Sequence, residues 1–244
     1  MKIIIKFFIF CLILFLYLHI QFHLKTSEDL EIYEIDQPSK QKLEEICDLR
    51  QPTIFHFYNE NIASQTNLSA IMEKYYAFDM KIRNIQDIHK KDEEIFMPLP
   101  LHSLVKLLND DQSASYFSED NNDFLNETGL IKTFKYNDAF YRPHMVSNCK
   151  YDILTGSQGC YTPFRYEVNY RNYFMPTDGT ITVKLAPPKS TRYLYPNYDY
   201  ENFEFSSPLN PWNPQNDYKA EFDKVRCLEF QIEVGKTLDR KSVV

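Results

Sequence analysis

Arg165 and Glu167 are the two residues whose types and spacing come nearest to a reactive site. Side chains two residues apart on a strand point to the same face, so a strand here would bring a cation and a carboxylate together. A histidine in place of Arg165 would give two neighbouring ligands of a metal centre. Arginine stays protonated and only donates hydrogen bonds, so Arg165 cannot ligate a cation and would repel one. The pair indicates an internal ion pair, an anion or polar-ligand pocket anchored by Arg165, or metal chemistry through unusual ligands.

Further polar and aromatic residues surround this pair in residues 157–188. The candidates for lining a ligand pocket are Thr162, Arg165, Tyr166, Glu167, Asn172 and Lys184. Several neighbouring aromatic side chains either line the same pocket or pack the core of the domain. They are Tyr161, Tyr166, Tyr170, Tyr173 and Phe174. The sequence assigns no catalytic residue and no metal ligand.

A series of short motifs in this part of the chain resembles the cupin-like (cupin-8 or JmjC-type) domain family. Thr162-Pro163 is similar to the approach to the family's metal-binding strand, Asn172 and Gly179 to the next strand and turn, and Pro187-Pro188 to that strand's exit. Segments 49–54, 154–157, 193–196 and 229–238 add weaker matches in the same order. The resemblance covers about residues 40–238, and its specificity comes from the order and spacing of the motifs together.

The resemblance implies a double-stranded β-helix, or jelly roll, preceded by helices. The resemblance also implies a site in which two histidines and one carboxylate hold Fe(II), with 2-oxoglutarate as co-substrate. Aligned on Thr162-Pro163, this chain has Arg165 at the first histidine and Glu167 at the carboxylate. Aligned backwards from the later turn, it has Tyr166 and Val168 there. Neither alignment contains a histidine.

The family's co-substrate contacts are only partly retained. Thr162 matches one of them, but the lysine that binds 2-oxoglutarate falls on Ile181. Lys184 lies three residues further on, and strand alternation places it on the opposite face. The resemblance therefore implies a degenerate member, a pseudoenzyme rather than an oxygenase.

The first 24 residues are typical of a membrane signal. Lys2 and Lys6 precede an apolar run at 7–24, which approaches the roughly 20 residues that a membrane span needs. Residues 19–24 lack the small side chains of a signal-peptide cleavage site, which favours an uncleaved signal anchor over a cleaved signal peptide. The lysine bias places the N-terminus in the cytoplasm and the following domain in a lumen.

Composition and pattern predict a single mainly β, α+β domain at 39–238, joined to the signal anchor by a polar linker at 25–38. Tyr and Phe are abundant (18 and 19 residues), which favours strands. The net charge of −7, without a basic stripe, argues against nucleic acid as a partner. Helices are expected at 39–48, 67–76, 101–108 and 123–130. Strands are expected at 53–57, 77–85, 115–119, 169–175, 180–185, 192–195 and 225–233.

Cysteine usage and glycosylation sequons bear on the compartment without deciding it. Cys149 and Cys160 would form a disulfide if two strands bring them together; otherwise the cysteines of the domain are free buried thiols. Asn67 and Asn126 each begin an Asn-x-Ser/Thr sequon, which matters only if the domain is lumenal.

The last six residues, 239–244, are predicted to be a non-native tail. A common sequencing-adapter string, GATCGGAAGAGCGTCGTG, translates to their sequence, DRKSVV. The sequence would then be a fragment of a cupin-like domain that is incomplete at its C-terminus. An unbroken native reading frame through these codons in a re-amplified transcript would refute this hypothesis.

These features together predict a membrane-anchored, single-pass cupin-like protein without a functional Fe(II)/2-oxoglutarate site. Its expected role is a non-enzymatic binding or structural module, with a membrane as one partner and a small anionic or polar ligand as another. No cofactor is expected. The alternative is a divergent 2-oxoglutarate-dependent oxygenase, using Fe(II) and 2-oxoglutarate, whose distal metal ligand is lost by truncation.

Overall fold

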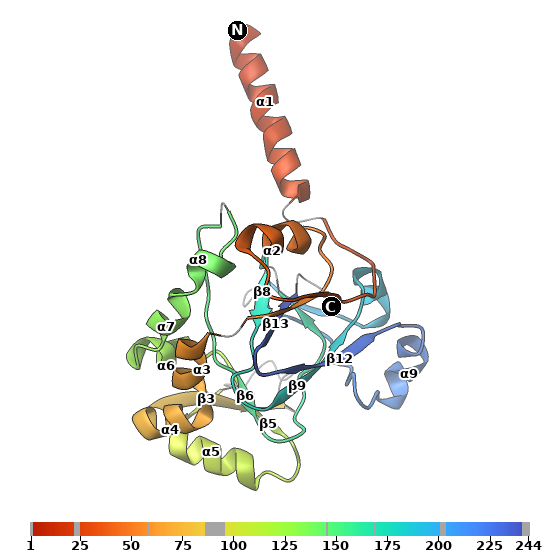
Figure 1. The fold of residues 1–244 in the computed structure, drawn as a ribbon. Helices are drawn as coiled ribbons and strands as arrows, with labels where there is room; N and C mark the ends of the chain where they lie inside the picture. The colour runs from red at the N-terminus through yellow and green to blue at the C-terminus, as the bar shows by residue number, and fades with distance from the viewer. Residues whose placement is uncertain are drawn as a thin grey trace.

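The chain folds as an α+β protein in which short strands form several small, mostly antiparallel sheets. The computed structural model describes residues 2–21, 25–57, 59–85, 96–144, 146–167, 169–200 and 204–240. Figure 1 shows one N-terminal helix projecting from a body that holds the other elements. The α+β class and the N-terminal helix are confirmed, while the jelly roll stays a prediction.

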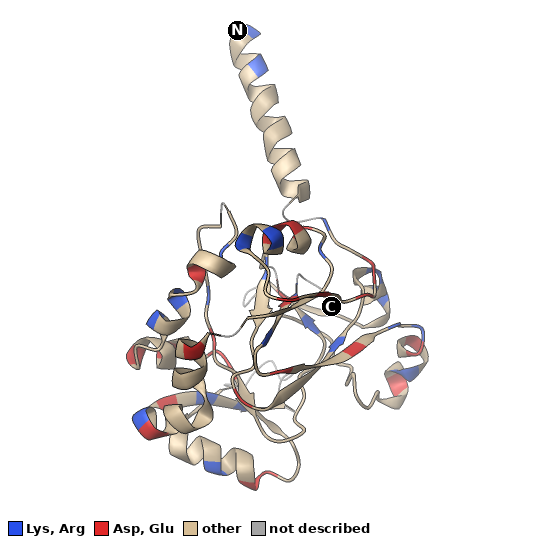
Figure 2. Ribbon diagram, in the orientation of Figure 1, with Lys and Arg blue, Asp and Glu red and all other residues tan. Residues whose placement is uncertain are grey.

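The N-terminal helix α1 (Lys2–His19) buries none of its residues against the body. It is long and apolar enough to cross a membrane, and a signal sequence has the same properties. Figure 2 shows lysines only near its start, whereas charges of both signs are scattered over the body. The helix is free of charge after Lys6 and buries nothing in the protein, so its apolar surface needs another apolar environment to cover it.

The segment predicted as a linker contains a strand. β1 (Tyr33–Ile35) pairs in parallel with β2 (Thr53–His56) at the edge of the central sheet. Two of its three side chains are exposed, so its sequence lacks the alternation that marks a half-buried strand. The backbone pairing with β2, rather than side-chain burial, defines it.

The central sheet has the order β1-β2-β13-β8. β13 (Lys236–Arg240) is antiparallel to β2 on one side and to β8 (Asn172–Phe174) on the other. β13 therefore extends two residues into the predicted non-native tail. Phe55 on β2 is fully buried, and other aromatic side chains pack against it beside this sheet.

Helix α2 (Lys40–Cys47) covers the central sheet and was predicted closely from its pattern. Ser39 caps it, because its side chain accepts a hydrogen bond from the third residue of the first turn. Leu43, Ile46 and Cys47 are buried, as their helical spacing indicated.

A second sheet, with the order β4-β3-β5-β6, forms the helix-covered part of the body. Its strands are β3 (Asp79–Asn84), β4 (Met97–Pro100), β5 (Tyr116–Ser118) and β6 (Thr155–Gly156). The helices in this part of the sequence are α3 (Glu60–Thr66), α4 (Leu68–Tyr75), α5 (Leu101–Asp110), α6 (Asn122–Glu127), α7 (Ile131–Lys135) and α8 (Asp138–Tyr141). Leu104 of α5 and Phe124 of α6 pack with Ile82 of β3 in the largest hydrophobic core cluster.

The C-terminal half of the chain adds two smaller sheets. One has the order β10-β11-β7, and the other pairs β9 with β12 in antiparallel register. The bounds are β7 (Arg165–Tyr166), β9 (Thr180–Leu185), β10 (Asn197–Asp199), β11 (Glu204–Ser206), β12 (Leu228–Glu233) and helix α9 (Asn216–Phe222). Phe164, Leu194 and Leu209 form the buried core beside β7.

Two local predictions in this half need correction. The strand predicted at 192–195 is wrong, since the 3-10 helix η3 (Pro188–Tyr193) covers the first half of this segment and no strand follows until β10. A proline at its start favours helical turns over a strand. Gly179 has φ +68, as a tight turn requires, but β8 and β9 on either side of it belong to different sheets.

We predict that Leu104→Ala lowers the free energy of unfolding by about 2–5 kcal/mol, because it opens a cavity in the largest core cluster. Leu49→Ala is the matched control, since Leu49 is 53% exposed. The measurement is denaturant unfolding of the full chain in detergent, followed by Trp212 fluorescence. Equal losses in the two variants would contradict the assignment of this core.

Candidate functional site

Glu119 lies on a tight turn directly after β5, and polar contacts hold this turn in place. Asp120 has φ 59, a left-handed conformation that is uncommon outside glycine. The Asp152 carboxylate accepts the backbone N–H groups of Asp120 at 2.8 Å and of Asn121 at 2.7 Å. The buried Asn121 side chain in turn accepts the backbone N–H of Lys81 on β3 at 2.8 Å. The turn therefore fixes the Glu119 backbone against β3.

Two arginines from different sheets converge on the Glu119 carboxylate. Nη1 of Arg165, on β7, lies 2.6 Å from Oε2 of Glu119, and Nη2 of Arg83, on β3, contacts Oε1. The side chains of Arg83 and Glu119 are 4% and 9% exposed, and that of Arg165 is 25% exposed. The guanidinium of Arg83 also lies 5.0 Å from the centre of the Phe96 ring.

This arrangement satisfies the main requirement for burying charge. Removing an ion from water costs several kcal/mol, and an oppositely charged partner in good geometry offsets that cost. Glu119 does so for two guanidinium groups at once. We call Arg83, Glu119 and Arg165 the Glu119 triad. The sequence analysis identified Arg165 but missed Arg83 and Glu119, since only the tertiary fold brings these three segments together.

Glu167 belongs to an adjacent set of polar contacts. Its Oε1 lies 3.7 Å from Nη2 of Arg240, and its Oε2 accepts a hydrogen bond from the Asn169 amide at 3.0 Å. The same Asn169 amide donates to Oδ1 of Asn172 at 3.0 Å. The structure thus links Glu167 and Asn172, two of the predicted pocket residues.

Arg240 connects this set electrostatically to the Glu119 triad. Burial lowers the pKa of Arg240, Glu167 opposes that shift, and the like charge of Arg165 adds to it. Arg240 thus brings Glu167, and through Asn169 also Asn172, into the same charged region as Arg165. Arg165 forms an ion pair with Glu119, and Glu167 forms one with Arg240. Arg240 lies in the predicted non-native tail, whereas the three residues of the Glu119 triad lie outside it.

Tyr166 packs into the hydrophobic core next to β7. Its ring stacks on Phe205 with centroids 4.5 Å apart, and it packs with the cluster around Phe164. Burial raises the pKa of its hydroxyl above the ordinary tyrosine value. Thr162 is half-buried in the loop before β7. These contacts of the partly buried Tyr166 are with core side chains, in agreement with the core-packing alternative.

Lys184 makes its contacts with the Pro-rich loop rather than with the Glu119 triad. Its Nζ donates to the Pro211 carbonyl at 3.1 Å and lies 3.2 Å from Oε2 of Glu229, its cross-strand neighbour on β12. The ammonium also lies 4.4 Å from the centre of the Trp212 ring, which is a cation–π contact. Lys184 therefore fastens the loop to the sheet of β9 and β12.

A second buried polar cluster lies between α2 and the central sheet. Nη2 of Arg171 is 2.9 Å from Oδ1 of Asp48, and its Nη1 donates to the Tyr173 hydroxyl at 3.4 Å. Burial raises the pKa of Asp239 to about 6 and also raises that of the neighbouring Cys47 thiol. Sequence patterns did not predict this cluster, because its members lie in separate segments of the chain.

No group of three or more His, Cys, Asp or Glu side chains within the described ranges is arranged to hold a metal ion. His56 is exposed on β2 and His102 is exposed on α5, while His89 lies outside the described residues. Cys149 and Cys160 are free thiols, as are the other cysteines.

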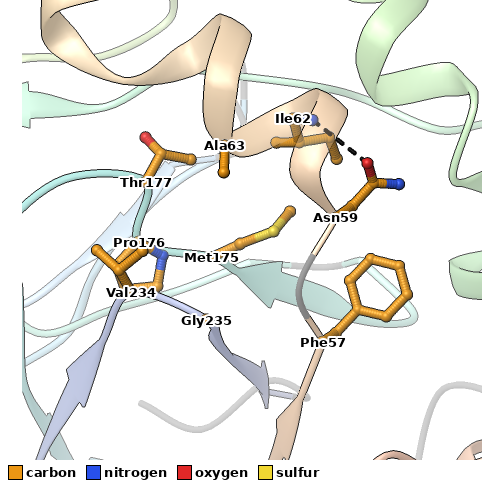
Figure 3. Close-up of a pocket in the computed structure, with 9 residues that line it drawn as sticks. All are labelled: Phe57, Asn59, Ile62, Ala63, Met175, Pro176, Thr177, Val234 and Gly235. Atoms are coloured by element: carbon orange, nitrogen blue, oxygen red, sulfur yellow. Dashed lines mark hydrogen bonds between the residues drawn. The ribbon is translucent and has the colours of Figure 1, made fainter.

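Figure 3 shows a pocket that is separate from the Glu119 triad. It lies where α3 begins, β8 ends and β12 turns into β13. Its lining residues are Phe57, Asn59, Ile62, Ala63, Met175, Pro176, Thr177, Val234 and Gly235. Its interior has space for roughly one water molecule, so this pocket does not have the dimensions of a substrate site.

Comparison with known proteins gives no relative for this chain: no protein-family model and no curated protein sequence matches it. The site must therefore be interpreted from its own geometry.

We predict that Glu119→Gln lowers the free energy of unfolding by about 3–5 kcal/mol, because it leaves two guanidinium groups without their carboxylate. Glu233→Gln, at an exposed position of β12, is the matched control and should change stability by less than about 0.5 kcal/mol. Urea unfolding of both variants in the same detergent provides the measurement. A loss at position 119 no larger than that of the control would show that the triad is not stabilising.

Proposed function

We propose that this chain is a membrane-anchored, cupin-like module that acts by binding or by structural support rather than by iron-dependent catalysis. One observation carries the proposal. Arg165, at the position where the resemblance places an iron-binding histidine, has its charge neutralised inside the protein by Glu119.

The chemistry of the triad supports the absence of an iron site. A guanidinium group has no lone pair to offer a metal, and Arg165 adds a positive charge where Fe(II) would lie. Glu119 holds that charge in place at 2.6 Å, and Arg83 shares the same carboxylate. In the other alignment, the histidine position falls on Tyr166, whose ring stacks on Phe205 in the core.

The cupin-like part of the proposal rests on sequence motifs and on the type of structure observed. Short antiparallel strands follow the helical N-terminal half, and β8 and β9 lie close to where the resemblance expects strands. A jelly roll is built from such strands. The proposal assigns the body of the protein to this architecture.

The membrane part of the proposal rests on α1. The helix buries no residue in the body and is apolar over its full length apart from Lys2, Lys6 and His19. At its end, Nη2 of Arg50 donates to the Gln21 carbonyl at 3.2 Å, which ties the body to the chain leaving the helix. We assign a single-pass anchor with the body in a lumen, on the side away from the two N-terminal lysines.

We predict that the purified full-length protein binds no stoichiometric Fe(II) and does not convert 2-oxoglutarate to succinate. Metal analysis after anaerobic incubation with Fe(II), together with a succinate assay, tests this, with an active 2-oxoglutarate oxygenase as positive control. One Fe(II) per chain with succinate formation would contradict the proposal and favour the divergent oxygenase.

We predict that the full chain resists alkaline extraction from membranes. Leu12→Arg with Leu16→Arg should release it, because each buried arginine costs roughly 2.5–3.5 kcal/mol at the centre of a span. Leu49→Arg, at an exposed position of the body, is the control and should leave the protein in the membrane fraction. An N-terminus beginning after residue 18 in the mature protein would instead identify a cleaved signal peptide.

A further inference from the structure

The two sequons occupy different structural positions. Asn67 is the N-cap of α4, and its Oδ1 accepts the backbone N–H of Ala70 at 2.8 Å. Its Nδ2 donates to the carbonyls of Ala63 at 3.0 Å and Ser64 at 3.5 Å, at the end of α3. The oxygen and the nitrogen of the Asn67 amide therefore both make hydrogen bonds that connect the end of α3 to the start of α4.

Asn126 is exposed near the end of α6, and its side-chain amide makes fewer hydrogen bonds than that of Asn67. Within the described part of the chain, its Nδ2 donates one hydrogen bond, to the Asn122 carbonyl at 2.8 Å. The helix ends at Glu127, its C-cap Thr128 is followed by Gly129 with φ +76, and a Cβ placed on Gly129 would meet nothing within 4 Å. The exposure of Asn126 leaves room for a bulky group on its side chain.

We infer that Asn126 carries an N-linked oligosaccharide in the folded protein and that Asn67 does not, an inference that rests on the proposed lumenal location of the body. An amide nitrogen has two hydrogens, and glycosylation replaces one of them. At Asn67 this would break a contact of the α3–α4 joint and place a sugar against a half-buried surface. At Asn126 the residue is exposed, and the one hydrogen bond that its Nδ2 donates within the described part of the chain uses one of the two hydrogens.

The transfer is chemically balanced with a lipid-diphosphate-linked oligosaccharide as donor. The Asn126 amide nitrogen forms a bond to the anomeric carbon of the sugar. The bond from that carbon to the diphosphate oxygen breaks, and the lipid diphosphate leaves with the electron pair. One amide proton passes to a base, and no oxidant or reductant is needed.

The test is synthesis of the full chain with sealed endoplasmic-reticulum microsomes, followed by gel mobility before and after treatment with a glycan-releasing amidase. We expect one amidase-sensitive shift. Asn126→Gln and Thr128→Ala should each abolish it, and Thr128→Ser should retain it. Ser69→Ala destroys the other sequon while keeping the Asn67 cap, and it should leave the shift unchanged.

Protease protection of the body in the same microsomes tests the lumenal location separately from glycosylation of Asn126. A protected body without a shift, or a shift that Ser69→Ala removes, overturns the assignment of Asn126 and leaves the lumenal location intact. A body digested in sealed microsomes overturns both the location and the glycan.

Discussion

Neutralisation of two arginines by the single carboxylate of Glu119 determines how the parts of the body can fit together. Arg83 and Arg165 belong to different sheets, and each brings a guanidinium group into a region shielded from water. Without a carboxylate between them, the two positive charges would repel each other at low dielectric and force the sheets apart. The turn at Asp120 and Asn121 exists to hold Glu119 at this meeting point, and the Asp152 carboxylate fixes that turn. The triad is therefore a contact that joins the two sheets.

This joint also constrains the function. A metal site of the family's type requires neutral or anionic ligands aimed at an open position. β7 instead presents a cation whose partner is supplied by the neighbouring sheet. The polar residues around it, Glu167 and Asn172, are engaged through Asn169. Helix α1 leaves its apolar surface uncovered by the body, and the charged residues at β7 are held by internal contacts. Both features agree with the proposed membrane-anchored binding or structural module.

The sequence predicted those elements whose signals are local. Helix α2 was predicted from the spacing of Leu43, Ile46 and Cys47, and β9 was expected at 180–185, directly after the turn residue Gly179. Strand β1 and helix η3 were missed, because an exposed three-residue strand and a proline-led turn carry little periodicity. Within the site, Arg165 was recognisable from a motif. Its partner Glu119 was not, since the contact spans 46 positions of sequence and depends on how two sheets meet.

The most direct test of this account is a double-mutant cycle between positions 119 and 165, measured as unfolding free energies of the full chain. The variants are Glu119→Gln, Arg165→Gln and the double substitution. The account predicts a coupling free energy of at least about 1 kcal/mol, with the double variant losing less stability than the sum of the single variants. Additive losses, with a coupling below about 0.5 kcal/mol, would show that Glu119 does not neutralise Arg165 and would contradict the central claim.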